Sequence, residues 1–265
     1  MNNTAVILTC YNRCSLTIKC LTKLFSLYNN LDVYLVDDNS TDGTLNEIAQ
    51  KFPKVHLIKG SGNLYWNRGM RLAWSHAARK GYDNYIWLND DVILYDFWLE
   101  ELFLCQSQNQ SETIISGVIE SHDKSKVIYG GFDQKKRLIL PNGISKEITY
   151  LNGNVVLVPK SVFKVLGNFD PVFHHDLGDV DYGLRAKKHG VKVVTTRKAV
   201  GSGETNDFCR VRVPCKSIIK RFRKLYSPLG SNPNITFYFR KKHYGYFSAI
   251  SYYIFIHLLV ITESI

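Results

Sequence analysis

The sequence predicts an α/β protein with a mostly parallel central sheet flanked by helices. Short apolar runs alternate with helical patterns between residues 5 and 90. The runs are apolar throughout rather than at every second position, as expected of parallel strands that are covered on both faces. Each run stops at a polar loop, and strands that alternate with helices in this way favour a parallel sheet.

Four apolar runs are expected to form strands, at residues 5–8, 33–36, 55–58 and 85–88. Helices fill the intervals between them. The first helix carries one apolar stripe, formed by Leu16, Cys20, Leu24 and Leu27. The second begins behind a capping Asp42 and ends near residue 52, and the third covers residues 70–79.

The second half of the chain mixes short β-like runs with two helices. The expected strands are residues 114–119, 127–129, 155–158 and 191–195, and the expected helices are residues 160–166 and 179–189. No internal repeat or low-complexity linker interrupts the chain. We therefore expect one domain over residues 1–205 and a basic, aromatic, helical C-terminal extension over residues 206–265.

The composition is that of a folded protein with an anionic partner. Apolar residues make up 45% and charged residues 22%, which excludes disorder as the main state. The formal charge of +11 predicts binding to nucleic acid, acidic lipid or a phosphorylated substrate. None of the six cysteines forms a C-x-x-C pair. Cys10 ends an apolar run and Cys20 lies among helical apolar positions, so we expect buried, reduced thiols rather than a metal site at Cys10 and Cys14, and a cytosolic protein. The apolar run at residues 5–8 is too short for a signal peptide.

The most informative motif is Asn89-Asp90-Asp91, directly after an apolar run. Adjacent carboxylates repel one another unless they are solvated or bridged by a cation. Hard oxygen ligands of this kind suit Mg²⁺ or Mn²⁺, held through one or two carboxylates and substrate phosphates. The alternative is a solvated turn that caps the next helix.

Two further segments carry groups that suit a nucleotide. Asp37 and Asp38 follow a strand and can accept hydrogen bonds from a ribose hydroxyl or a base N–H; the alternative is an Asx turn, and Asp42 fits a capping role better. In the loop at residues 62–69, Arg68 can meet phosphate beside a helix N-terminus, as can the following Arg71.

A third polar segment, residues 169–185, combines carboxylates and histidines at the start of a helix. A catalytic base must be a titratable group within reach of the acceptor hydroxyl, and Asp179 at the helix start is the candidate. The alternative for Asp179 is a favourable charge at the helix N-terminus. Asp181 and Arg185 are four residues apart and are expected to form an ion pair on the helix surface.

In this order and spacing, the segments resemble the family 2 glycosyltransferases, which have the GT-A (Rossmann-like) fold. Thr-Cys-Tyr-Asn-Arg at 9–13 and Asp-Asp-Asn-Ser-Thr-Asp-Gly-Thr at 37–44 resemble the nucleotide-binding half of that family, and Asn89-Asp90-Asp91 stands at its Asp-x-Asp metal motif. Residues 177–181 match its Glu-Asp-x-Asp segment with Gly178 in place of Glu, and Arg71 replaces a usual Asn. The resemblance covers roughly residues 4–200.

The resemblance implies a single displacement that inverts the sugar anomer, with Asp179 as the base and Mg²⁺ or Mn²⁺ at Asp91 and Asn89. It assigns nucleotide binding to eight residues: Thr9, Tyr11, Arg13, Asp37, Asp38, Asn63, Arg68 and Asp90. The implied donor is a dTDP- or UDP-sugar, and the implied acceptor is a glycan linked to polyprenyl diphosphate. The sequences of residues 62–66 and 178–185 are similar to those of bacterial rhamnosyltransferase-type enzymes, which build surface polysaccharides such as O-antigen or capsule.

The C-terminal extension has the pattern of a membrane-surface segment. Residues 210–224 hold seven basic residues and no acid, with apolar residues on one helical face. Residues 246–261 are uncharged and aromatic but shorter than the roughly 20 residues that span a bilayer. We therefore expect a peripheral protein on the inner face of the cell membrane. The alternative is a helix packed on the core or in a homodimer.

Two other classes compete with this interpretation. Nucleotidyltransferases of similar architecture carry a longer, Gly- and basic-rich loop after the first strand, whereas residues 9–13 are short and contain no Gly. A nucleic-acid-binding module would need a reader motif, which the basic residues lack, and the strand-end carboxylates would repel phosphate without a metal. We therefore expect no nucleic-acid partner.

Overall fold

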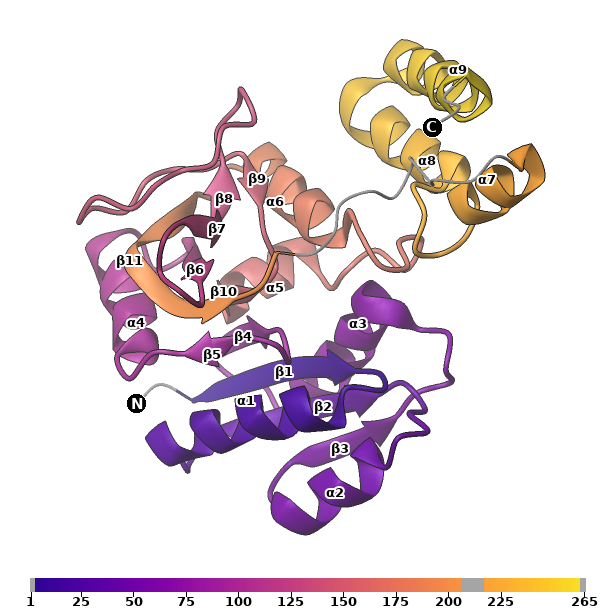
Figure 1. Ribbon diagram of the computed structural model, residues 1–265. Helices are drawn as coiled ribbons and strands as arrows, with labels where there is room; N and C mark the ends of the chain where they lie inside the picture. Colours follow the sequence, from indigo (N-terminus) through magenta and orange to yellow (C-terminus); the bar gives the residue numbers. More distant parts are fainter. Residues whose placement is uncertain (1–2, 206–216, 263–265) are drawn as a thin grey trace.

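The computed structural model describes residues 3–205 and 217–262 (Figure 1). Its strands are β1 Thr4–Cys10, β2 Asp32–Asp37, β3 His56–Lys59, β4 Asn84–Leu88, β5 Ile93–Leu94, β6 Ile114–Ser121, β7 Val127–Tyr129, β8 Gly131–Phe132, β9 Tyr150–Leu151, β10 Val155–Pro159 and β11 Val193–Gly203. Its helices are α1 Cys14–Leu27, α2 Thr44–Lys51, α3 Tyr65–Ala78, α4 Trp98–Gln108, α5 Lys160–Leu166, α6 Gly178–Lys188, α7 Ile218–Leu225, α8 Pro233–Tyr244 and α9 Tyr246–Thr262.

The first half forms the expected parallel layer. Strands β3, β2, β1 and β4 lie side by side in that order, and all three pairings are parallel. Every residue of β1 and β4 is buried, which explains their unbroken apolar character. Cys10 pairs with Asp37 at the ends of β1 and β2, so the polar loops after these strands start at one edge of the sheet. The α/β class is confirmed.

The second half makes the sheet mixed rather than mostly parallel. β10 runs antiparallel between β4 and β6, and β11 pairs with β6 in parallel and with β5 in antiparallel fashion. No helix precedes β10 to carry the chain back for a parallel entry; the chain arrives from the short β8–β9 pair. The long, irregular β11 curls around this end of the sheet (Figure 1).

Helices cover both faces of the sheet and define two apolar layers. One layer contains residues of α1, α2 and α4, and the other contains residues of α3, α5 and α6. In α1 the buried face is formed by Thr17, Cys20, Leu21 and Leu24. Leu16, which was expected on that face, is 43% exposed because it lies one position to the side of it.

Two helices were not expected from the sequence. α4 carries the helical spacing of Trp98, Leu102 and Cys105, all buried, and this signal was present but overlooked. α8 begins at Pro233 behind a capping Asn232, whose side chain accepts hydrogen bonds from the Asn234 and Ile235 amides.

The C-terminal helices α7, α8 and α9 form a separate group of helices in Figure 1. The expected boundary at residue 206, and the first basic residues of the extension, lie outside the described residues. The basic amphipathic helix is observed as α7, and the apolar stretch as α9. Within the described parts, no helix combines the length and apolar character needed to cross a bilayer.

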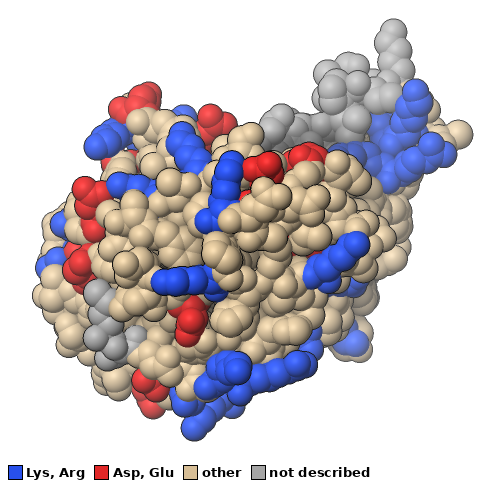
Figure 2. Space-filling model, turned by 90° about the horizontal axis from the view of Figure 1, so that it is seen from below, with Lys and Arg blue, Asp and Glu red and all other residues tan. Residues whose placement is uncertain are grey.

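Lys and Arg side chains are spread over the face seen in Figure 2, whereas the acidic side chains of that view lie mainly toward its left-hand side. This distribution agrees with the formal charge of +11.

Candidate active site

The carboxylates that follow β4 share one guanidinium. Arg13 Nη2 lies 2.8 Å from Asp91 Oδ2, and Arg13 Nη1 lies 3.2 Å from Asp90 Oδ1. Asp90 also accepts a hydrogen bond of 3.0 Å from Thr17 Oγ1. Arg13 comes from the loop after β1, so the two polar loops that the sequence places at strand ends do meet.

Asp90 and Asp91 differ in their surroundings. Asp90 is buried, and burial raises its pKa to about 6 although the Arg13 charge opposes the shift. The Asp91 side chain is 26% exposed. Burial by itself would lower the pKa of Arg13, but the Asp90 and Asp91 charges outweigh it and raise that pKa. Asp91 is therefore the carboxylate that faces outward.

Asn89 is held between two neighbours. Its Oδ1 accepts a hydrogen bond of 2.7 Å from Trp66 Nε1, and its Nδ2 donates one of 2.8 Å to Asn154 Oδ1. The backbone repeats the link, because the Asn89 amide donates to the Asn154 carbonyl at 2.9 Å. An amide side chain suits these two bonds, whereas a carboxylate could not donate to Asn154. This explains an Asn where the family has its first Asp.

Trp66 connects the Asn89 end of the site to Asp179. A Cβ added to Gly153 would lie 2.7 Å from Trp66 Cη2 and 3.2 Å from the Asp179 Cβ, so the indole, Gly153 and Asp179 are packed together. The Gly153 amide donates a hydrogen bond of 3.0 Å to Asp179 Oδ2. Asn89 bonds to the indole of Trp66, and Asp179 bonds to Gly153, which packs on the same indole, so Asn89 and Asp179 belong to one site.

Asp179 has the environment of a tuned carboxyl group. Burial raises its pKa to about 6, although the Val180 and Gly153 amides act in the opposite direction. α6 has Leu177 at its N-cap and no side-chain cap hydrogen bond, so Asp179 does not cap that helix, although it lies in the first turn, where a negative charge is favourable. A carboxyl group with its pKa near the working pH is suited to accept a proton.

Asn67 is a site residue that sequence reasoning missed. It is buried, and its Nδ2 donates to the Asp170 and Phe173 carbonyls at 2.9 and 3.0 Å. Its Oδ1 lies 1.7 Å from where a Cβ on Gly178 would be. Asn67 thus fills the space that a side chain at position 178 would need, which explains Gly178 where the family has Glu. The indication that the sequence offered for Asn67 is its position directly after Trp66.

Asp37 and Asp38 are engaged by the protein itself. Asp37 is buried and accepts hydrogen bonds from the Ser40 amide, at 3.2 Å, and from the Ser40 hydroxyl, in an Asx-type turn. Asp38 is also buried and holds the loop before α3, accepting from the Gly62, Leu64 and Tyr65 amides at 2.7, 2.8 and 3.1 Å. Both carboxylates lie at the expected edge of the sheet and shape its loops.

Asp42 caps the start of α2 as expected, but from the residue before the N-cap position, which is Gly43. α2 begins at Thr44 behind Gly43, and Asp42 accepts a hydrogen bond of 3.1 Å from the Thr44 amide. Its other oxygen accepts one of 3.0 Å from the Cys14 amide, which joins the first turns of α1 and α2.

The other predicted nucleotide-binding residues are spread along the same edge. Thr9 is buried under α3, donating a hydrogen bond of 3.2 Å to the Val36 carbonyl. Tyr11 is 51% exposed, and Asn63 is exposed in the loop before α3. Arg68 Nε donates to the Pro171 carbonyl at 2.9 Å, so it supports the loop before α6.

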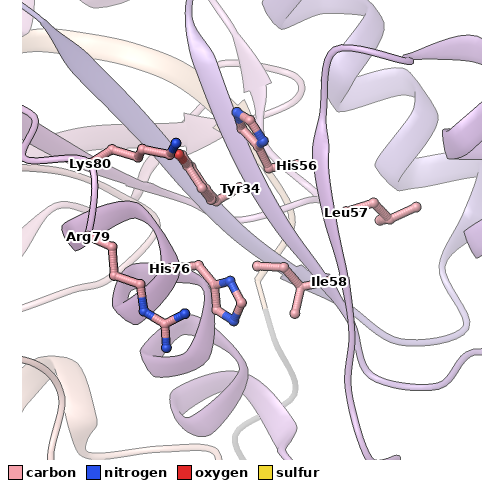
Figure 3. Close-up of a pocket in the computed structure, with 7 residues that line it drawn as sticks. All are labelled: Tyr34, His56, Leu57, Ile58, His76, Arg79 and Lys80. Carbon is pink, nitrogen blue, oxygen red and sulfur yellow. The ribbon is translucent and has the colours of Figure 1, made fainter.

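A separate hollow lies beside the amino-terminal end of β3. It is lined by Tyr34, His56, His76 and Arg79, among others, and His56 stacks on Tyr34 with ring centres 4.4 Å apart (Figure 3). His56 is the first residue of β3, whereas the candidate site lies where β1, β2 and β4 end. The hollow is therefore not part of the candidate site.

Comparison with known proteins decides the family. The sequence profile described as Glycosyl transferase family 2 matches residues 5–160, which is more than half of the chain. The chain belongs to glycosyl transferase family 2. No curated protein sequence matches this glycosyltransferase.

Solved structures match the glycosyltransferase in fold at low sequence identity. The mannosyltransferase PcManGT from Pyrobaculum calidifontis, in complex with GDP-Man and Mn²⁺, matches with a TM-score of 0.59 and 16% identity over 98% of this chain and 74% of that one. GalNAc-T7 with UDP, GalNAc and Mn²⁺ matches with a TM-score of 0.61 and 13% identity over 97% of this chain and 55% of that one. The glycosyltransferase thus spans about half the length of GalNAc-T7 and has the GT-A fold.

The residues of the glycosyltransferase fit a cation only in one coordination mode. Among the described residues, no three His, Cys, Asp or Glu side chains gather into a cage. Both polar atoms of the Asn89 amide are engaged, which leaves the outward Asp91 carboxylate, whose Oδ2 is paired with Arg13, as the oxygen donor. Mg²⁺ and related ions are often held by one or two carboxylates and by substrate phosphates, and the Asp91 carboxylate suits that mode.

Proposed function

We propose that this glycosyltransferase moves a sugar from a nucleoside-diphosphate sugar to a hydroxyl of a glycan acceptor, with inversion at the anomeric carbon. The observation that carries the proposal is the position of Asp179. This carboxyl group has a raised pKa and is joined through Gly153 and Trp66 to the polar segment after β4. The closeness of Asp179 to this segment supports a single displacement in which Asp179 accepts a proton and the segment after β4 meets the leaving diphosphate.

In this mechanism, Asp179 accepts the proton of the acceptor hydroxyl as that oxygen attacks the anomeric carbon. The Gly153 and Val180 amides donate to its two oxygens at 3.0 and 2.8 Å, which fixes the orientation of the carboxylate. Trp66 packs against Gly153 and so supports the loop that holds the carboxylate. The attack comes from the face opposite the leaving diphosphate, so the product has the other anomeric configuration.

At the other end of the site, we assign the diphosphate to the edge formed by Arg13 and Asp91. Bound there, Mg²⁺ or Mn²⁺ would be held by Asp91 and would neutralise charge on the leaving diphosphate. Arg13 forms ion pairs with both carboxylates and so joins the loop after β1 to the loop after β4. The Mn²⁺ in PcManGT and GalNAc-T7 supports this part of the proposal.

For the biological role, we propose synthesis of a bacterial surface polysaccharide on a polyprenyl-diphosphate-linked acceptor, with a dTDP- or UDP-sugar as donor. The sequence of residues 178–185, which resembles rhamnosyltransferase-type enzymes, supports this role. The segment between residues 208 and 262 supports it too, because it contains no acid and a lipid diphosphate needs cationic neighbours. The alternative, a sugar-nucleotide nucleotidyltransferase, would join a sugar phosphate to a nucleoside triphosphate through a new phosphoanhydride bond and release pyrophosphate, and would not break the bond between sugar and diphosphate.

A donor screen tests the proposal. The purified protein is incubated with Mn²⁺ and with dTDP-, UDP- and GDP-sugars, and release of nucleoside diphosphate is measured with and without a lipid-diphosphate acceptor. Acceptor-dependent release, with NMR showing the opposite anomeric configuration in the product, supports the proposal. Release of pyrophosphate from a nucleoside triphosphate and a sugar phosphate would indicate the nucleotidyltransferase, and retention of configuration would exclude Asp179 as the base of a single displacement.

A further inference from the structure

One side of α9 is apolar and exposed along the whole helix. Five residues at helical spacing make up this side, which we call the α9 stripe: Phe247, Ile250, Ile254, Leu258 and Ile261. Phe247 is 88% exposed, and the other four are between 48% and 54% exposed. At 1.5 Å per residue the stripe is about 21 Å long. Monomeric proteins rarely leave such a continuous apolar row open to water.

The opposite side of α9 is packed, which fixes the direction of the stripe. Ala249, Ile256 and Val260 are buried, and Ile256 and Val260 form a small core with Leu225 of α7. Tyr226 also approaches α9, with its hydroxyl 2.8 Å from His257 Nε2. α9 lies at the outer edge of the group of C-terminal helices (Figure 1). The stripe therefore faces away from the packed side of α9.

The C-terminal helices carry exposed cationic side chains and no acid. Residues 217–262 contain no Asp or Glu. On α7, Lys220 and Arg223 are exposed. On α8, the exposed Lys241 has its Nζ 4.6 Å from the ring centre of Tyr246, the first residue of α9. Lys241 thus lies beside the first turn of α9, and the C-terminal helices as a group combine the exposed apolar row with positive charge.

We propose that the α9 stripe docks on a bilayer of anionic phospholipid, with α9 lying in the plane of the interface. An interfacial helix needs an apolar face for the acyl boundary and cations for the acidic headgroups, and aromatic residues such as Tyr246 and Phe247 are favoured at headgroup level. At 17 residues, α9 is shorter than the roughly 20 that cross a bilayer. A second copy is the poorer partner for this surface, because a symmetric contact would bring its cations against one another.

The test is vesicle flotation of the full chain, which needs no sugar transfer and so does not depend on the proposed function. Wild-type protein is expected to float with vesicles of phosphatidylglycerol and phosphatidylcholine at low salt. It is expected to float less with pure phosphatidylcholine, which carries no net charge. It is also expected to float less at 1 M salt, because charge interactions are then screened beyond about 3 Å. The double variant Phe247→Glu/Ile254→Glu is expected to lose at least tenfold in the fraction bound.

A matched control separates the stripe from exposed apolar surface in general. Leu140 and Ile144 are 59% and 61% exposed in the segment between β8 and β9, so Leu140→Glu/Ile144→Glu adds the same charge elsewhere. This control is expected to float like the wild type, and Lys220→Glu/Arg223→Glu is expected to lose the preference for anionic vesicles. Unfolding curves confirm that all variants are folded.

Three results would overturn the proposal. The first is equal flotation of the stripe variant and the wild type. The second is an equal loss in the control at residues 140 and 144. The third is a wild-type dimer, seen by light scattering, that becomes a monomer in the stripe variant while the wild type ignores anionic vesicles; that result would assign the stripe to a second copy of the chain.

Discussion

The Asp181 carboxylate of α6 lies 2.7 Å from Lys242 Nζ of α8, which joins the C-terminal helices to the helix that carries Asp179. Asp181 also accepts from Arg185 Nε at 2.9 Å and lies 2.8 Å from His243 Nε2. The ion pair with Arg185 was expected on the helix surface, but Asp181 is completely buried because α8 covers it. Lys242 reaches Asp170 as well, at 2.8 Å.

We expect Asp181→Asn to destabilise the protein strongly. The substitution leaves several cations facing a neutral group in a buried place, and breaking such a cluster typically costs about 3–5 kcal/mol. The free energy of unfolding in urea measures the loss. Glu47→Gln, which breaks the exposed pair between Glu47 and Lys51, is the control and is expected to cause no measurable change. An equal effect of the two substitutions would show that the α6–α8 contact does not stabilise the fold.

The same cluster sets a pH dependence of stability. Burial alone would raise the pKa of Asp181, but the hydrogen bonds from His243 and Lys242 and the charge of Arg185 outweigh it and lower that pKa. A carboxyl group whose pKa is lowered by folding stabilises the protein above its ordinary pKa of about 3.9 and loses that contribution as the pH falls below it. We expect the difference in stability between the wild type and Asp181→Asn to shrink as the pH falls below about 4.

Asp179→Asn is expected to abolish most sugar transfer without unfolding the protein. A positioned general base contributes about 10²–10⁴-fold, so kcat should fall by that factor. The Asn side chain can still accept from the Gly153 amide, and it carries no buried charge. Thermal unfolding should therefore show a Tm no lower than that of the wild type. Full activity in this variant would remove Asp179 from the mechanism.

The pH profile of kcat/KM reports the same group. The base works as the carboxylate, and burial raises the pKa of Asp179 to about 6, so kcat/KM should fall as the pH drops through about 6 and level off above it. Asp90 has a pKa raised to about the same value. Measuring the profile of Asp90→Asn separates the two, because the inflection persists there only if it belongs to Asp179.

Removal of divalent cations is expected to stop sugar transfer, and Mn²⁺ should restore it. In Asp91→Asn the Mn²⁺ concentration for half-maximal activity should rise by at least about 10–100-fold, because that is already the usual cost of losing an outer partner of a metal ligand and Asp91 is proposed to hold the ion directly. Asp96→Asn is the matched control, because Asp96 is a surface acid with a side chain 79% exposed. Unchanged activity after exhaustive chelation would leave charge neutralisation to Arg13.

Gly153→Ala tests the close packing around Asp179. The added Cβ would lie 2.7 Å from Trp66, closer than such contacts occur, so the indole and Asp179 must shift. Because small displacements at a reacting centre can cost about 10²-fold, we expect a loss of that order in kcat. Gly203→Ala is the control, since the nearest atom to its added Cβ would be Ile119 Cγ2 at 3.6 Å, an ordinary contact. Equal activity of the two variants would show that the indole does not position Asp179.

Local patterns were enough to predict the α/β class and the sheet edge that carries the polar residues. The apolar runs that became β1, β2 and β4 were identifiable because strands covered on both faces admit few polar residues, whereas β3 lies at the edge of the sheet and is only partly buried. The acids after β2 and β4 were identifiable because each directly follows such a run. Cys10 and Cys20 were likewise correctly expected to be buried.

Only the tertiary structure decided which polar groups face outward and which are consumed inside the protein. Asp38 is taken up by three backbone amides and Asn89 by Trp66 and Asn154, whereas the Asp91 side chain remains partly exposed. The burial of Asp181 depends on α8, more than fifty residues further along the chain. Burial and hydrogen bonding are set by groups that meet only when the chain folds, so a one-dimensional pattern of residue types cannot specify them.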